Sequence, residues 1–145
     1  MTQKATFAAG CFWKPQQLFD ELKGVTKTTV GYTGGRTTNP TYKDICYSDT
    51  GHAEVTELEF DPDVVSFGAL CDFFFNIHDP TQMNRQGPDH GDQYRSAIFT
   101  HSNEQADIAK DKIAALGANV VTEVTPAPDF WPAEEYHQHY INKRG

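Results

Sequence analysis

The stretch Ala8-Ala9-Gly10-Cys11-Phe12-Trp13, followed closely by Pro15, marks the point where a strand turns into a helix. Proline is favoured in the first turn of a helix, so a small-residue turn brings a cysteine and two aromatic side chains to a helix start. There the unpaired N–H groups and the helix dipole favour the nucleophilic thiolate of Cys11. The alternative is a buried cysteine in an aromatic core, the usual environment of a free thiol.

Length and composition bound the class of protein. A chain of 145 residues suits one domain, residues 1–145, with a core of its own. A net charge of -8 and a pI near 5.1 disfavour nucleic acid or an anionic membrane as the partner. No basic and apolar leader and no apolar run of spanning length is present, so we expect a cytoplasmic protein. Cys11, Cys46 and Cys71 lack the spacing of a disulfide framework.

Hydrophobic patterning predicts an α+β chain in which strands and helices do not alternate strictly. The predicted strands cover residues 5–9, 28–32, 53–60, 97–100 and 119–124, and the predicted helices cover residues 15–23, 66–77 and 102–116. Cys71 lies on the apolar stripe of its helix, so we expect it in the core. The arrangement favours a two-layer sandwich with a mixed sheet, a ferredoxin-like core and a long C-terminal coil.

Two further stretches carry groups suited to proton transfer. Glu54, in Gly51-His52-Ala53-Glu54, begins a strand among small and apolar residues, and burial there would raise its pKa. Asp89 and Tyr94 close the long polar loop at residues 78–93 and offer an acceptor and a phenolic donor. The plainer interpretations are a solvated glutamate at a strand end and a polar loop that leads into a strand.

Other kinds of site find little support in the sequence. The histidines are scattered and form no ligand spacing of a known metal site, even with Cys46 or Cys71 added. No phosphate-binding glycine loop and no dinucleotide fingerprint is present. We therefore expect neither a metal nor a bound cofactor.

Six segments in order resemble the peptide-methionine sulfoxide reductases of the A type. They are Gly10-Cys11-Phe12-Trp13, Gly31-Tyr32-Thr33-Gly34-Gly35, Asn39-Pro40-Thr41-Tyr42, Gly51-His52-Ala53-Glu54-Val55, Gln93-Tyr94-Arg95-Ser96 and Glu135-Tyr136-His137-Gln138. They extend over nearly the whole chain, which makes a chance match of all six implausible. The resemblance implies reduction of the S epimer of methionine sulfoxide, free or in proteins, and hence repair of oxidised proteins.

The resemblance also implies a role for each matching residue. Cys11 corresponds to the nucleophile that becomes a sulfenic acid as methionine leaves. Glu54 corresponds to the acid, and Tyr42 and Tyr94 to phenolic donors for the sulfoxide oxygen. The remaining matches concern substrate binding. Phe12 and Trp13 correspond to the pocket for the S-methyl group, and Asp89 corresponds to the group that holds the substrate backbone. A neutral Glu54 would also spare Cys11 the repulsion that a carboxylate exerts on a thiolate.

The sequence departs from the family pattern at two places. Lys14 replaces the usual glycine, and Pro15-Gln16-Gln17 stands where an acidic residue is common. The chain ends at Lys143-Arg144-Gly145, without the Gly-rich tail and resolving cysteine of many relatives. We expect Cys46 to be a small core residue, so the sulfenic acid is reduced by an external thiol, either thioredoxin or glutaredoxin with glutathione. The chain is expected to act as a monomer.

Two rival functions make different demands on these residues. Another thiol enzyme, such as a peroxidase or a Cys–His hydrolase, would act on peroxides or esters; the hydrolase would need a histidine paired with Cys11. A non-catalytic module would bind methionine-containing peptides through Phe12 and Trp13 and tolerate loss of the Cys11 sulfur.

Overall fold

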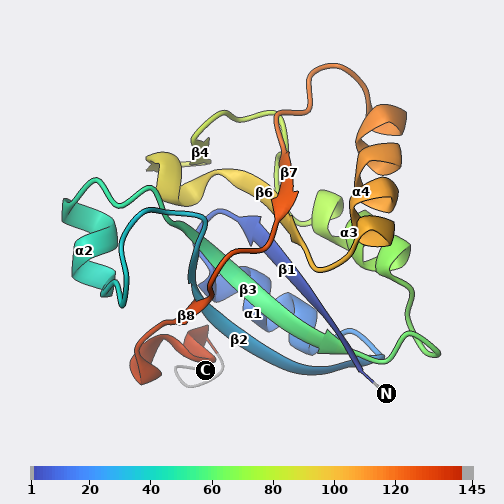
Figure 1. Cartoon of the computed structure of the whole chain (residues 1–145), viewed down its shortest axis with the longest axis horizontal. Helices are drawn as coiled ribbons and strands as arrows, with labels where there is room; N and C mark the ends of the chain where they lie inside the picture. Colours follow the sequence, from blue (N-terminus) through green and yellow to red (C-terminus); the bar gives the residue numbers. More distant parts are fainter. Residues whose placement is uncertain (1, 142–145) are drawn as a thin grey trace.

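A computed structural model describes residues 2–141 and centres on a mixed six-stranded sheet (Figure 1). The strands are β1 (Gln3–Ala9), β2 (Val25–Thr33), β3 (Ala53–Phe60), β6 (Ser96–Thr100), β7 (Glu123–Pro126) and β8 (Trp131–Pro132). Their order across the sheet is β7-β6-β1-β3-β2-β8. Neighbouring strands are antiparallel except β6 and β7, which are parallel. The outermost strands are short, and each ends in a proline, Pro126 and Pro132.

Three helices cover one face of this sheet and form the second layer. They are α1 (Trp13–Asp20), α3 (Phe67–Asn76) and α4 (Asn103–Leu116). Alternate strand residues such as Phe7 and Leu58 meet Phe74 and Cys71 of α3 in one continuous core. The predicted α+β two-layer architecture is therefore confirmed, and Cys71 is fully buried as expected. No helix within residues 2–141 is long and apolar enough to cross a membrane.

The opposite face of the sheet is covered by the C-terminal coil instead of helices. Ala8, Ala53, Val55 and Phe99 point to this side and are buried under partly buried residues of the coil, including Phe130. Small side chains on β1 and β3 let the coil lie close to the sheet. The predicted C-terminal coil thus forms part of the core cover, although Lys143-Arg144-Gly145 lies outside the described residues.

Two sequence-based assignments need correction. The strand predicted at residues 119–124 forms later in the chain, as β7, and only residues 123 and 124 are shared. Val121 donates its backbone N–H to the Pro80 carbonyl, and pairing with β6 begins only at Glu123. The polar segment before β3 contains a helix that was not predicted, α2 (Tyr42–Tyr47). A reciprocal capping box between Thr41 and Asp44 starts this helix.

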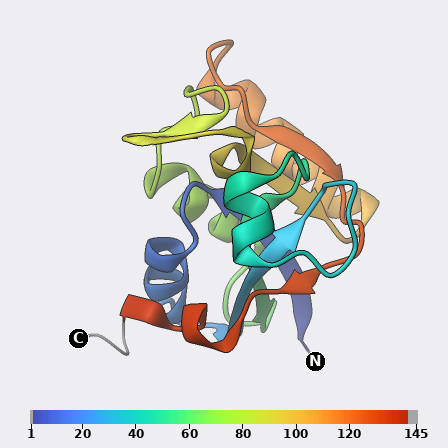
Figure 2. The ribbon, with the colours of Figure 1, turned by 90° about the vertical axis from the view of Figure 1, so that its left-hand side faces the viewer.

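Smaller elements complete the long loop and the C-terminal segment. The loop predicted at residues 78–93 holds a hairpin of β4 (Arg85–Gln86) and β5 (Asp89–His90) and leads into a 3-10 turn, η1 (Asp92–Tyr94). A second 3-10 turn, η2 (Glu135–His137), follows β8. Figure 2 views the molecule from the side on which α2, the hairpin and the C-terminal segment lie.

A buried histidine joins the helical layer to the sheet. His78 Nδ1 donates to the Phe74 carbonyl at 2.7 Å, and His78 Nε2 accepts from the Ser96 hydroxyl at 2.8 Å. Ser96 in turn contacts the Thr122 hydroxyl at 2.7 Å. This geometry needs a neutral ring with one donor and one acceptor. Burial lowers the pKa of His78 to about 4, which keeps the ring neutral in the folded chain.

We expect His78 to make folding stability fall in mild acid. The unfolded chain protonates this ring near pH 6.5, whereas the folded chain does so only near pH 4. The stability contribution is therefore complete above pH 6.5 and is lost as the pH falls towards 4. Measured by urea unfolding, the free energy of unfolding should fall between pH 7 and pH 5 in both proteins. The fall should be about 2 kcal/mol smaller in His78→Gln than in the parent. The same substitution at exposed His90 is the control, and equal losses in His78→Gln and the parent would contradict this account.

Candidate active site

The Cys11 thiol lies in the turn between β1 and α1. Gly10 has a φ of 85°, and a Cβ there would stand 2.8 Å from Gln86 Cβ of the β4–β5 hairpin, so only glycine fits this turn. Helix α1 begins at Trp13 with Phe12 as its N-cap, which confirms that Cys11 just precedes a helix N-terminus. The turn before Cys11 thus lies directly against the hairpin.

Glu54 is the buried acid of the site. It lies on β3, its side chain is 1% exposed, and its Oε1 accepts the backbone N–H of Phe12 at 3.3 Å. Its other oxygen, Oε2, is buried and has no hydrogen-bond partner among residues 2–141. Burial raises the pKa of Glu54 to about 8 against the effect of the Phe12 hydrogen bond, and the nearby Asp89 adds to the rise. The carboxyl group is therefore mostly protonated at neutral pH.

The resting state of Cys11 differs from the sequence-based expectation. Burial raises the pKa of the Cys11 thiol to about 12, and the charge of Glu54 adds to this rise. The backbone N–H of Trp13 at the helix start lowers the pKa, but it does not outweigh the loss of solvation. The helix start thus acts in the predicted direction, but the prediction that it favours the thiolate overall is wrong, because burial has the larger effect. Below about pH 8 the protonated Glu54 no longer contributes its repulsion.

Aromatic rings from distant parts of the chain pack against the two aromatic residues that follow Cys11. Phe12 is fully buried, with its ring centroid 5.7 Å from that of Tyr32 and 5.4 Å from that of His137. Trp13 donates its indole N–H to His137 Nδ1 at 3.0 Å and stacks on Tyr140 at 3.8 Å. The two residues predicted to line a methyl pocket are thus held in place by the C-terminal segment, 124 residues away in the case of His137.

The two phenols predicted as donors come from separate elements. Tyr42 is the first residue of α2, and its ring packs 4.4 Å from His137. Tyr94 lies in η1, and burial and the charge of Glu54 raise its pKa. Burial likewise raises the pKa of Tyr42, so both phenols keep their protons at neutral pH. Cys46 lies one helical turn after Tyr42 and is half-buried, so the expectation of a core residue is wrong.

The β4–β5 hairpin brings Asp89 to the same place. Gln86 receives the backbone N–H of Asp79 at 2.9 Å and donates to the Asp79 carbonyl at 2.9 Å, which ties the hairpin to the end of α3. The charge of Asp89 raises the pKa of Cys11, Glu54 and Tyr94 alike. All seven residues singled out from the sequence therefore gather at one end of the sheet.

Three residues of this region had no role in the sequence analysis. His52, beside Glu54, accepts the Gly35 backbone N–H at 3.0 Å and binds the Thr37 carbonyl at 2.8 Å, so it shapes the neighbouring loop. His137 supports Trp13, and Glu134 accepts two hydrogen bonds from the site. The sequence offered one signal for them, their place within or beside the six matching segments.

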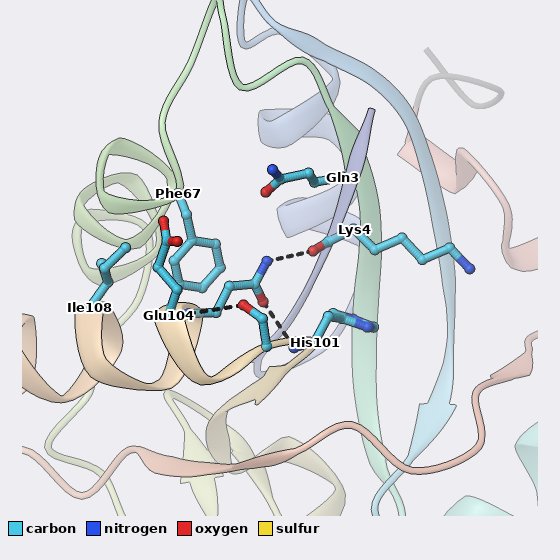
Figure 3. A pocket seen from close by; sticks show the side chains of 8 residues that line it. Gln3, Lys4, Phe67, His101, Glu104 and Ile108 are labelled. Atoms are coloured by element: carbon cyan, nitrogen blue, oxygen red, sulfur yellow. Dashed lines mark hydrogen bonds between the residues drawn. The ribbon is translucent and has the colours of Figure 1, made fainter. Parts of the chain in front are cut away.

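A surface hollow with a volume of about 480 Å³ lies elsewhere, at the start of α4 (Figure 3). Its lining contains none of the residues gathered around Cys11. The amide of Gln105 there already bonds the Lys4 carbonyl and the His101 N–H, and Ser102 caps the helix. Gln105 and Ser102 thus use their polar groups in hydrogen bonds to the backbone that stabilise the fold. Among residues 2–141, no group of three or more His, Cys, Asp or Glu is placed to hold a metal ion.

Comparison with known proteins agrees with this geometry. A family model described as peptide methionine sulfoxide reductase matches residues 3–145. A peptide methionine sulfoxide reductase MsrA from Acidobacterium capsulatum is 54% identical over 148 residues, which cover 98% of this chain and 95% of that protein.

Solved structures resemble the whole chain as well. Reduced Mxr1 from Saccharomyces cerevisiae aligns with a TM-score of 0.90 at 38% identity, over 98% of this chain and 85% of that one. Mxr1 in complex with Trx2 aligns with a TM-score of 0.64 at 27% identity, over 96% and 84%. A buried acid, a cysteine at a helix start and a shared fold now agree with the matching segments, and the chain belongs to the peptide methionine sulfoxide reductase family.

Proposed function

We propose that this chain reduces the S epimer of methionine sulfoxide, free or in proteins, with Cys11 as nucleophile and Glu54 as proton donor. One observation carries the proposal: the Glu54 carboxyl is buried close enough to Cys11 to act on its charge, and its Oε2 has no partner in the described part of the chain. A protonated oxygen without a partner is suited to a ligand that brings an acceptor, as a sulfoxide oxygen does. The aromatic rings of Phe12 and Trp13 offer an apolar surface for the methyl group.

The reductive step balances within these groups. The Cys11 sulfur attacks the sulfoxide sulfur, negative charge grows on the oxygen, and Glu54 supplies a proton to it. Tyr42 and Tyr94 donate hydrogen bonds to the same oxygen and stabilise the charge. The S–S bond formed by this attack and the S–O bond of the sulfoxide then both break, and the oxygen becomes bonded to the Cys11 sulfur as a sulfenic acid. Methionine leaves with its sulfur reduced by two electrons, which the Cys11 sulfur supplies. The thiol proton returns to Glu54, so the acid is restored.

External thiols complete the cycle in this proposal. Cys71 is buried in the core and far from the chemistry, so it offers no second thiol. A sulfenic acid on Cys11 condenses with a small thiol such as glutathione, and glutaredoxin releases the mixed disulfide by exchange. Thioredoxin is the other candidate, since the relative Mxr1 forms a complex with Trx2. We further propose a single catalytic domain over residues 1–145 that acts as a cytoplasmic monomer and needs no bound cofactor.

The rival functions fit these contacts less well. A Cys–His hydrolase needs an imidazole hydrogen-bonded to the thiol, but His137 uses its Nδ1 to accept the indole N–H of Trp13. No hydrogen bond within residues 2–141 joins a histidine to Cys11. Family membership and the protonated Glu54 also favour an enzyme over a module that only binds peptides.

The direct test is consumption of one epimer. With dithiothreitol as the sole reductant, chromatography of a racemic mixture should show that the S epimer is consumed and the R epimer remains. Cys11→Ser should abolish turnover, because an alcohol cannot act as nucleophile and then as a reducible acceptor of oxygen. Consumption beyond half of the racemate would contradict the pocket model. Activity of Cys11→Ser above background would remove Cys11 from the mechanism.

The pH dependence tests Glu54. Its acid form is needed, and its pKa is about 8, so the single-turnover rate of methionine formation should fall as the pH rises through 8. In Glu54→Gln this rate should be lower by about a hundredfold or more, because an amide cannot give the proton. The decrease of the rate around pH 8 should also disappear in this variant. The control is Glu59→Gln, on the same strand but outside the site. A parent rate that rises between pH 8 and pH 9 would show that thiol ionisation limits the step instead.

Recycling is tested at Cys46. Mass spectrometry after one equivalent of substrate without reductant should find a sulfenic acid on Cys11 and no internal disulfide. Cys46→Ser should then turn over almost as fast as the parent with glutathione and glutaredoxin. A Cys11–Cys46 disulfide, with slow recycling in Cys46→Ser, would show that α2 supplies a resolving thiol.

A further inference from the structure

A carboxylate outside the proposed catalytic set links two tyrosines of the site. Glu134 Oε1 accepts the hydroxyl of Tyr32 at 3.0 Å, and Glu134 Oε2 accepts the backbone N–H of Tyr42 at 2.9 Å. Burial alone would raise the pKa of Glu134, but the hydrogen bonds it accepts hold that pKa below its usual value. Glu134 is thus a charged group with both oxygens engaged, and such bonds are the stronger kind.

The bond to Tyr42 is not needed to start helix α2. The capping box already joins the Thr41 hydroxyl to the Asp44 N–H at 3.1 Å and the Asp44 carboxylate to the Thr41 N–H at 3.0 Å. Those bonds are local and exposed. Glu134, by contrast, lies 92 residues away in sequence, so its bond fixes where the helix stands relative to the rest of the site.

Besides the bond to Glu134, helix α2 is held by apolar contacts, and the ring of Tyr42 packs 4.4 Å from that of His137. The helix has six residues, too few to be stable alone, and Ile45 is its only buried residue. Ile45 packs in a cluster with Phe12, Val30, Tyr32 and Ala133. The first residue of the helix carries the phenol that faces the sulfoxide oxygen in the proposed mechanism. A shift of this residue would therefore move a donor.

Tyr32 supplies the second anchor of the same carboxylate. It is fully buried on β2 and pairs in register with Glu54 on β3. Its hydroxyl donates to Glu134. The Glu134 carboxylate therefore bonds the central sheet through one oxygen and helix α2 through the other. Sheet and helix are thereby held at a fixed separation around the site.

We propose that Glu134 is a positioning residue, which holds the Tyr42 phenol where it can donate to the sulfoxide oxygen. This inference rests on the proposed role of Tyr42. Displacement of a donor by about an ångström is enough to slow a reaction markedly, although substrate still binds through other groups. Loss of the Glu134 carboxylate should therefore lower kcat and leave KM nearly unchanged.

The test is a double-mutant cycle between Glu134 and Tyr42. Glu134→Gln has one acceptor oxygen where two are used, and it should slow single-turnover methionine formation about tenfold or more. In a Tyr42→Phe background the same change should cost less than about twofold, because the phenol that it positions is already gone. Glu135→Gln makes the same charge change one residue later and should retain the parent rate. If Glu134→Gln is unfolded at the assay temperature, Glu134→Asp replaces it in the cycle.

The outcomes separate this inference from the proposed function. Equal losses in both backgrounds, or a higher KM with kcat unchanged, would overturn the positioning role and leave the function of Cys11 and Glu54 intact. A Tyr42→Phe enzyme as fast as the parent would overturn the donor role of Tyr42 together with this inference. Activity in Cys11→Ser would instead count against the proposed function itself.

Discussion

The site depends on keeping water away from one carboxyl group. Glu54 holds its proton at neutral pH because burial denies the charged form its solvation, and no cation is needed to explain this. The same exclusion of water raises the pKa of Cys11, so thiol and acid rest in their neutral forms together. Walls from four separate parts of the chain provide the dry environment: the turn before α1, β3, α2 and the C-terminal segment. Water admitted through any of these walls would solvate the carboxylate, and Glu54 would then lose its proton at a lower pH.

The C-terminal segment closes this environment through side-chain bonds to the backbone. The Gln138 amide accepts the Val30 N–H at 2.9 Å and donates to the carbonyls of Val30 and Ala133. Gln16, fully buried on α1, accepts the His139 N–H and donates to Thr28. The amide of Gln16 suits a position that must both donate and accept.

The sequence predicted the features that depend on local pattern and missed those that depend on distant contacts. Strand β3 was predicted with its observed bounds, 53–60, because apolar alternation is visible in the sequence. Helix α2 is too short to show periodicity, and the β-branched Val121 suggested a strand where contacts with another loop impose a coil. The proposed catalytic residues were recognised from short motifs. The supporting contacts of Glu134 arise from tertiary folding over about a hundred residues and leave no local pattern.

The two edge strands of the sheet, β7 and β8, determine whether an extended segment of an oxidised protein can add to the sheet. Oxidised proteins are often partly unfolded, and their extended segments can add to an open sheet edge and seed aggregation. Here the outermost strands have four and two residues, and Pro126 and Pro132 each remove a backbone donor. Such edges are poor templates for strand addition. An extended segment of another chain therefore finds little backbone to pair with at either edge.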